Sequence, residues 1–106
     1  MAKTIEKQRA TALDINADGV AVLTLDTPGK LNVLSPAVFE ELNERFEELG
    51  NKSEVKALII ESAKRGSFVA GADITHLATI TDAVAGAEMS SQAQGVFQKL
   101  DDLPFP

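Results

Sequence analysis

The sequence predicts an α/β domain made of a β-hairpin, a helix, a buried strand, a loop and a long helix. Three observations predict this class. Short apolar or alternating segments at 11–16, 20–25 and 55–60 have the length and pattern of strands. Between the last two of these segments, apolar residues recur at the spacing of a helix. Turn-forming clusters rich in Gly, Pro, Asn and Asp separate the segments.

Composition narrows the classes of partner. The chain has 106 residues, of which 44% are hydrophobic and 25% are charged, as in one small globular domain. Its net charge is −6, with 16 acidic and 10 basic residues. Nucleic acids and anionic membranes bind basic surfaces, so we expect neither as the main partner. The chain has no cysteine and one histidine, which argues against disulfides, thiolate metal sites and imidazole-rich metal sites.

The sequence also bears on location. No apolar run approaches the ~18 residues that a membrane-spanning helix needs. The first ten residues, MAKTIEKQRA, lack the apolar core of a secretory signal. We therefore expect no membrane span and a cytoplasmic location. Residues 1–10 are polar and are predicted to be a lead-in to a domain that covers 11–106.

The predicted hairpin consists of 11–16 and 20–25, joined by the turn Asn16-Ala17-Asp18-Gly19. The second strand, VAVLTL, is apolar at nearly every position. That pattern is typical of a strand covered on both faces in a parallel sheet.

A helix is predicted after the Pro-Gly loop at 26–30. Ser35 followed by Pro36 is a capping residue followed by proline at the first helical position, and Gly50 ends the helix. The apolar stripe of this helix is Phe39, Leu42, Phe46 and Leu49. Its five glutamates (Glu40, Glu41, Glu44, Glu47 and Glu48) lie opposite the stripe, so we expect a solvated face and no acid/base pair. With the strand at 55–60, this helix completes a βαβ unit.

A second long helix is predicted from about Asp82 to Pro104. Its apolar stripe is Met89, Ala93, Val96, Leu100 and Leu103. A strand-helix-strand-helix order requires a further strand, and this stripe requires a surface to cover. We therefore expect a fold cut before its end. A small α/β domain that ends in a helix is the alternative.

Two loops leave the carboxyl ends of the predicted parallel strands, 26–35 and 61–73, and ligands bind at such ends in open sheets. Gly29 and Gly71 allow the backbone to approach a ligand closely. The loops also carry Lys30, Lys64 and Arg65, which suit a phosphorylated ligand. Solvated surface residues are the alternative for these three.

The second loop contains SFVAGADITHL, residues 67–77, which is more apolar than an ordinary surface loop. We expect Phe68 and Val69 to enter the core and Asp73 to cap a short helical turn. The backbone N–H of Ala72 would then face a ligand and donate to a developing oxyanion. An ordinary helix start is the alternative. His76 lies nearby, and a lone histidine without a carboxylate partner is more often incidental than catalytic.

These segments carry a resemblance. GVAVLTLDTPGKLNVLS, followed by a helix, a buried strand and SFVAGADITHL, resembles the enoyl-CoA hydratase/isomerase (crotonase) family. Within that family the chain is most similar to the hydratase portion at the N-terminus of multifunctional fatty-acid oxidation α subunits. The resemblance covers about 11–106. The phrase F-x-A-G-A-D-I at this distance from N-V-L carries most of it.

The resemblance implies the N-terminal portion of a crotonase-like spiral fold that forms homo-oligomers. It implies acyl-CoA thioesters as ligands, hydration of 2-enoyl-CoA in fatty-acid β-oxidation as the reaction, and no cofactor besides the CoA of the substrate. It assigns the backbone N–H of Ala72 to one half of an oxyanion hole. The positions that it places along the CoA are Lys30, Leu31, Val33, Ala70, Asp73, Ile74 and Thr75.

The resemblance also implies that important groups lie beyond Pro106. The family's second oxyanion donor and its two acid/base glutamates belong to a later turn, so we expect this chain to be inactive alone. A second hypothesis is a free-standing acidic α/β regulatory or binding module. Such modules usually present a phosphorylatable Ser or Thr at a strand-to-helix turn, and 70–73 contains neither.

Overall fold

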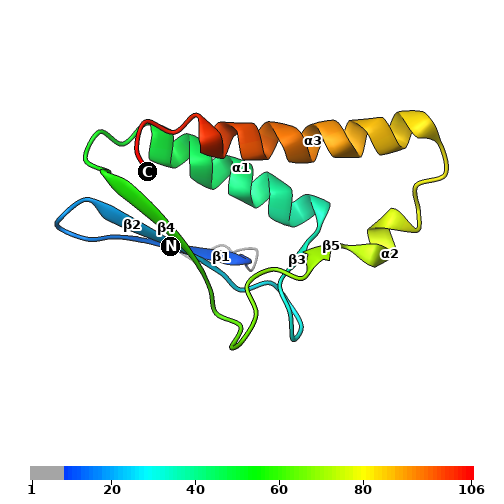
Figure 1. Ribbon diagram of the computed structural model, residues 1–106, viewed down its shortest axis with the longest axis horizontal. Coiled ribbons are helices and arrows are strands. Elements are labelled where there is room, and N and C mark those ends of the chain that lie inside the picture. The colour runs from blue at the N-terminus through cyan, green and yellow to red at the C-terminus, as the bar shows by residue number, and fades with distance from the viewer. Residues whose placement is uncertain (1–8) are drawn as a thin grey trace, which may run out of the picture.

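The structure is a computed structural model that describes residues 9–106 (Figure 1). Its strands are β1 (Thr11–Ile15), β2 (Val20–Leu25), β3 (Val33–Leu34), β4 (Ala57–Ser62) and β5 (Gly71–Ala72), and its helices are α1 (Pro36–Gly50), α2 (Ile74–Leu77) and α3 (Ala83–Asp101). The hairpin, both long helices and their order along the chain are as predicted. Most of the predicted lead-in, residues 1–8, lies outside the described residues.

The main sheet has the strand order β1-β2-β4. β1 pairs with β2 antiparallel, and β2 pairs with β4 parallel, which confirms the hairpin and the βαβ unit. β4 begins and ends two residues later than the predicted 55–60. The reason is that the N–H of Val55 donates to the carbonyl of Lys52 at 3.2 Å, so Val55 still belongs to the turn after α1.

The long helices form two layers over one face of the sheet (Figure 1). The buried side chains of α1 and β2 share one hydrophobic core, and α3 runs beside α1 in the same direction. The predicted stripe of α1 is buried throughout, since Phe39, Leu42, Phe46 and Leu49 are at most 7% exposed. Burial of four such side chains stabilises the fold by about 1.5–3 kcal/mol each.

The expectation that β2 is covered on both faces is wrong. Ala21, Leu23 and Leu25 point into the core, whereas the alternate side chains of the strand are only half-buried. The neighbouring Ile59 of β4 is 51% exposed. Both long helices lie on the same side of the sheet, so within residues 9–106 no helix covers the opposite face.

The stripe of α3 packs mainly on α1 and not on the sheet. Val96 is buried, and Phe97 meets Phe39 edge to face, with ring centroids 5.7 Å apart, although Phe97 remains 48% exposed. After α3 the chain returns to the sheet. The N–H of Leu58 donates to the carbonyl of Pro106 at 2.8 Å, on the edge of β4 that β2 does not occupy.

One of the five helix glutamates is not solvated as predicted. Glu41 is 15% exposed, and its carboxylate accepts hydrogen bonds from the N–H groups of Ala10 and Thr11 and from the Thr11 hydroxyl. Arg45 donates to the same Thr11 hydroxyl at 2.9 Å, and Arg9 lies 3.6 Å from Glu41. This cluster fastens the start of β1 to α1.

The Glu41 cluster makes stability depend on pH. Burial raises the pKa of the Glu41 carboxyl, but the hydrogen bonds from Thr11 and Ala10 and the charge of Arg9 outweigh burial, so the pKa lies below its ordinary value. A carboxyl with a lowered pKa stabilises the folded state above its unfolded pKa of about 4.3 and loses that contribution as the pH falls through the folded pKa.

We expect Glu41→Gln to lower the free energy of unfolding by about 2 kcal/mol at pH 7, because buried hydrogen bonds to a charged acceptor are lost. At pH 3, below the unfolded pKa of about 4.3, the loss should be smaller, because the stabilisation by the charged carboxyl decreases as the pH falls toward and through the folded pKa. Urea unfolding at the two pH values measures both losses. Glu48→Gln, at an exposed position of the same helix, should change little. Equal losses for Glu41→Gln at both pH values would contradict the prediction.

Candidate active site

The loops after β2 and β4 meet at one edge of the sheet. β2 and β4 run parallel, so their carboxyl ends lie side by side, and the chain leaves both ends toward a second, two-stranded sheet. In that sheet β3 pairs with β5 in parallel, which places Val33 opposite Gly71 and Leu34 opposite Ala72. The fold thus brings together the two segments that the sequence singled out as ligand loops.

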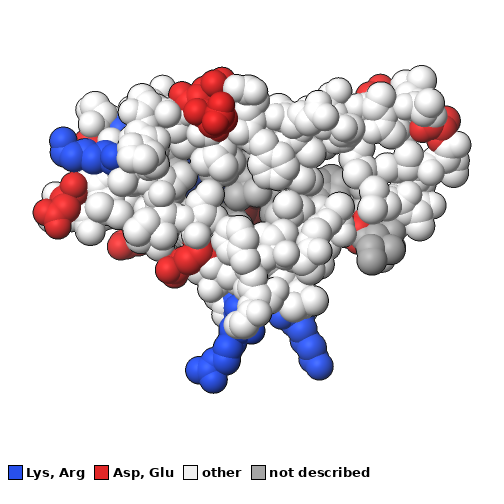
Figure 2. Space-filling view, viewed as in Figure 1, with Lys and Arg blue, Asp and Glu red and all other residues white. Residues whose placement is uncertain are grey.

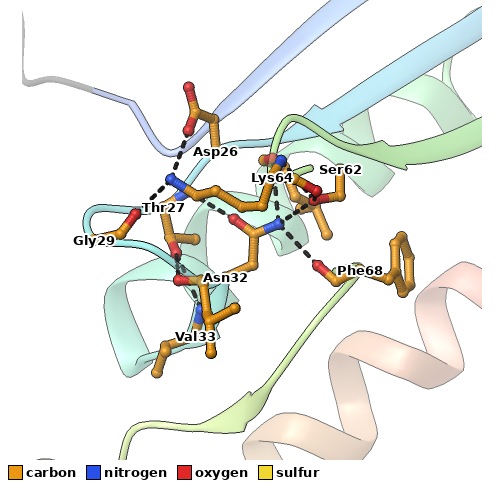
Figure 3. Close-up of polar contacts among 10 residues, drawn as sticks. Asp26, Thr27, Gly29, Asn32, Val33, Ser62, Lys64 and Phe68 are labelled. Carbon is orange, nitrogen blue, oxygen red and sulfur yellow. Dashed lines mark hydrogen bonds and ion pairs between the residues drawn. The ribbon is translucent and has the colours of Figure 1, made fainter. Parts of the chain in front are cut away.

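A buried asparagine joins these loops (Figure 3). Asn32 is fully buried, and its Oδ1 accepts the N–H of Thr27 at 3.0 Å. Its Nδ2 donates to the carbonyl of Phe68 at 2.8 Å, to the hydroxyl of Ser62 at 2.9 Å and, more weakly, to the carbonyl of Leu25 at 3.3 Å. One carboxamide therefore contacts the last residue of β2, the last residue of β4 and the segment before β5.

Two hydroxyls extend this network. Thr27, also buried, accepts the N–H of Val33 at 3.0 Å and donates to the carbonyl of Leu31 at 3.3 Å. Ser62 accepts the N–H of Lys64 at 2.9 Å. Sequence reasoning assigned no role to Asn32, Thr27 or Ser62. The available signal was a single amide between apolar neighbours in L-N-V-L, just before a helix cap.

The backbone around Ala72 is oriented by its pairing with β3. The N–H of Ala70 donates to the carbonyl of Asn32 at 2.8 Å, and the N–H of Asp73 donates to the carbonyl of Leu34 at 3.3 Å. In a regular strand neighbouring N–H groups point to opposite sides, and the N–H of Asp73 is directed at β3, so we infer that the N–H of Ala72, across the Gly71 turn from Ala70, points away from β3. Gly71, with φ of 138°, makes this turn in a region that other residues rarely adopt. Ala72 itself is exposed.

Asp73 caps α2, as predicted. Its Oδ1 accepts the N–H groups of Thr75 at 3.0 Å and His76 at 3.4 Å. Its backbone carbonyl accepts the N–H of Leu77 at 2.9 Å. Thr75 is exposed and follows Ala72 by three positions in the chain. Ile74 begins α2, and its side chain lies outside the described part of the structure.

The prediction for the apolar pair before this turn is half right. Val69 is half-buried and packs against the core. Phe68 is 55% exposed and points away from the network, as Figure 3 shows. Phe68 anchors this part of the segment through its backbone carbonyl, which accepts a hydrogen bond from Asn32. Its ring does not contribute to this anchor.

The three basic residues of the loops have different environments. The ammonium of Lys64 lies 2.9 Å from Asp26 and donates to the carbonyl of Gly29 at 2.8 Å, and its side chain is only 14% exposed. Lys64 therefore bridges the two loops. The prediction that its charge serves a phosphorylated ligand is not supported, because Asp26 already pairs with that charge. Lys30 and Arg65 are exposed. Basic side chains project from the lower edge of the molecule in Figure 2, where these loops turn.

The sequence-predicted CoA residues fall into two groups that the β3–β5 pair holds side by side. The first group lies around β3, where Lys30 and Leu31 are exposed and Val33 is half-buried. The second group follows from Ala70, which is exposed, through the Asp73 cap of α2. Both groups flank the exposed Ala72.

Two further observations concern residues 9–106 as a whole. None of the helices in this range is long and apolar enough to cross a membrane. No cluster of three or more His, Cys, Asp or Glu side chains within it has an arrangement that would hold a metal ion.

Comparison with known proteins identifies relatives of this arrangement. The sequence model of the enoyl-CoA hydratase/isomerase family matches residues 15–106. The fatty acid oxidation complex subunit alpha of Vibrio parahaemolyticus is 38% identical over 103 residues, which is 96% of this chain and 15% of the relative. The same subunit of Shewanella frigidimarina is 40% identical over 90 residues, 84% of this chain and 13% of the relative. The chain thus spans about 15% of the length of the curated relatives that it matches.

Solved structures show the same fold. The enoyl-CoA hydratase of Mycobacterium smegmatis aligns with a TM-score of 0.85 at 25% identity, over 93% of this chain and 38% of that one. The enoyl-CoA hydratase of Bacillus anthracis aligns with a TM-score of 0.83 at 22% identity, over 92% of this chain and 38% of that one. The described elements correspond to part of the crotonase fold. By the family match and the identity to its relatives, the chain belongs to the enoyl-CoA hydratase/isomerase family.

Proposed function

We propose that residues 11–106 form the N-terminal part of an enoyl-CoA hydratase, and that they bind a 2-enoyl-CoA thioester and donate one hydrogen bond to its carbonyl. The observation that carries the proposal is the orientation of Ala72. It is exposed, it follows a glycine with positive φ, and the N–H that donates to β3 is that of the next residue, Asp73. The similarity to enoyl-CoA hydratases and to the fatty acid oxidation subunits supports the substrate class.

The chemistry agrees with this role. Addition of water to a 2-enoyl thioester creates negative charge on the carbonyl oxygen as an enolate forms. A fixed donor placed where that charge develops stabilises the transition state, and removal of one such donor costs about 10²–10³ in rate. The proposed reaction needs no cofactor besides the CoA of the substrate.

The CoA would lie along the two groups that flank Ala72. Lys30 is exposed beside β3 and offers a charge to a CoA phosphate, while Leu31, 48% exposed, offers an apolar surface. Ala70 and Thr75 are exposed on the other side of Ala72. Asp73 contributes through its cap of α2, because its carboxylate is already bonded to two backbone N–H groups.

In this proposal the chain binds the acyl-CoA and supplies one hydrogen-bond donor, and none of its residues is assigned to proton transfer. None of the helix glutamates is assigned to acid/base work, and Glu41 is committed to the β1–α1 contact. We also propose that the protein is a homo-oligomer, which the half-exposed face of the main sheet supports. A cytoplasmic location stays a prediction from the sequence. The family similarity does not favour the alternative of a free-standing regulatory module.

A 2-enoyl-CoA labelled with ¹³C at its carbonyl tests the proposal. We expect the chain to bind it and to shift the carbonyl resonance downfield without hydrating it. Replacement of Ala72 by L-lactate through semisynthesis puts an ester oxygen in place of that N–H and keeps the side chain. The shift should then disappear and the affinity should fall by about tenfold, the equivalent of one hydrogen bond.

The matched control is the same ester replacement at Ala37, an exposed residue in the first turn of α1, where N–H groups have no partner within the helix. It should leave the shift and the affinity unchanged. Unchanged binding by the Ala72 ester, or no binding by the unaltered chain, would contradict the proposed function.

Gly71→Ala should weaken acyl-CoA binding through the backbone. An added Cβ meets no atom within 4 Å, so the cost comes from the positive φ alone and is about 1–2 kcal/mol. Relief of this strain would rotate the neighbouring Ala72 N–H. Gly66→Ala is the control, because Gly66 also has positive φ and open space. Calorimetry should show similar thermal destabilisation of both variants and weaker binding only for Gly71→Ala. Equal affinities would argue against this orientation.

Replacement of Lys30 and of Lys64 by Met should affect different properties, ligand affinity in the first case and stability in the second. Lys64→Met should lower the free energy of unfolding by about 1 kcal/mol, because a mostly buried bridge to Asp26 and Gly29 is lost. Lys30→Met should leave stability unchanged and weaken acyl-CoA binding, with a reduced dependence on salt. Denaturant unfolding and titration at two salt concentrations separate the effects. A stable Lys64→Met variant with lost affinity would reverse the assignment.

A further inference from the structure

Residues 65–70, which precede the pairing of Gly71 and Ala72 with β3, have few contacts that fix them in place. Among the described side chains, only that of Asn32 hydrogen-bonds to this segment, through the carbonyl of Phe68 at 2.8 Å. The backbone carbonyl of Asn32 also accepts the N–H of Ala70 at 2.8 Å. The ring of Phe68 is 55% exposed, so it does not anchor the segment. Val69 adds a partly buried contact with the core.

The two bonds from Asn32 reach the residues that control the position of Ala72. Phe68 and Ala70 stand four and two positions before Ala72 in the chain. With both fixed, only Gly71 separates the clamped backbone from the proposed donor. The path by which the chain reaches Ala72 therefore depends on Asn32, whose carboxamide holds Phe68 and whose backbone carbonyl holds Ala70.

The chemistry of this position requires an amide. Asn32 accepts a hydrogen bond from the N–H of Thr27 on one side and donates to Phe68, Ser62 and Leu25 on the other. A carboxylate keeps the acceptor and loses the donors, and an alanine loses both. The site is fully buried, so water cannot replace the lost partners without entering the core.

We propose that Asn32 is a positioning residue for the oxyanion donor. Its carboxamide holds residues 67–73 in the conformation that presents the Ala72 N–H to the thioester. The inference rests on the proposed function for its effect on binding. Its effect on the conformation of the segment can be measured without a ligand.

The test compares Asn32→Ala and Asn32→Asp with Thr11→Val. Asn32→Asp has nearly the same shape as the wild type and lacks the donor, whereas Asn32→Ala also leaves a cavity. Thr11→Val removes a buried hydroxyl in the distant Glu41 cluster and serves as a control for lost stability. The readouts are the amide hydrogen exchange of Ala70 and Asp73, relative to that of Leu23 in β2, and the affinity for 2-enoyl-CoA.

We expect both Asn32 variants to increase the relative exchange of Ala70 and Asp73 by about tenfold or more. Affinity should fall in proportion to the fraction of molecules that keeps the segment correctly placed, because only that fraction binds. Thr11→Val should change neither, even where it lowers the melting temperature as much. Asn32 variants that match Thr11→Val in both readouts at equal stability would overturn the proposal.

The remaining outcomes are also decisive. If the wild-type chain binds no acyl-CoA, the proposed function fails, and the exchange data alone decide whether Asn32 positions the segment. If neither Asn32 variant folds, the side-chain amide protons of wild-type Asn32 replace them. They should exchange about a hundredfold more slowly than those of the half-buried Asn43. Equal rates for the two side chains would refute the clamp.

Discussion

The carboxamide of Asn32 is the interaction on which the site depends. Where two parallel strands end, their last carbonyls and side chains leave the ladder, and burial of such groups is costly unless each finds a partner. Asn32 supplies partners to the ends of both strands, at Leu25 and Ser62, and to the returning segment at Phe68. No buried side-chain nitrogen or oxygen within residues 9–106 lacks a hydrogen-bond partner. The irregular backbone at this edge is therefore stable in one arrangement.

Charge serves the fold as much as the ligand in this acidic chain. Lys64 pairs with Asp26 and donates to the backbone carbonyl of Gly29 in the other loop. A residue that the sequence suggested for a phosphate site therefore stabilises the contact between the two loops. Glu41 has the corresponding role at the start of β1, where Arg9, Ala10 and Thr11 direct hydrogen bonds or charge at it. Residues of the same type nearby, Lys30 and Glu48, are exposed. Long-range contacts, and not residue type, decide which charges are structural.

Local signals account for what the sequence predicted correctly. Ser35 and Asp82 cap their helices through N–H groups only three residues away, and the α1 stripe repeats over one element. Apart from the start of β4, which a local turn shifts, the errors involve contacts between distant segments. The Asn32–Phe68 bond spans 36 positions and the Lys64–Gly29 bond spans 35, so no local pattern reports either one. The exposure of Phe68 and the open face of β2 likewise depend on where other elements lie. For the site, sequence resemblance indicated the segments, and only the structure revealed the residues that hold them.

A continuous series of contacts connects the hydrophobic core to the proposed donor. The side chains of α1 are buried against β2, and Ser35, which caps α1, directly follows β3 in the chain. Core packing therefore fixes β3, the pairing of Leu34 with Ala72 fixes β5, and Asp73 ends β5 by capping α2. Each step is short, so little flexibility accumulates between the core and Ala72. A donor for an oxyanion must be in place before charge develops, because reorganisation during the reaction would cancel its benefit. In this fold a pair of two-residue strands, β3 and β5, is enough to meet that requirement. Only Ser35 separates the end of β3 from the rigid helix α1, so the helix holds the strand pair in place.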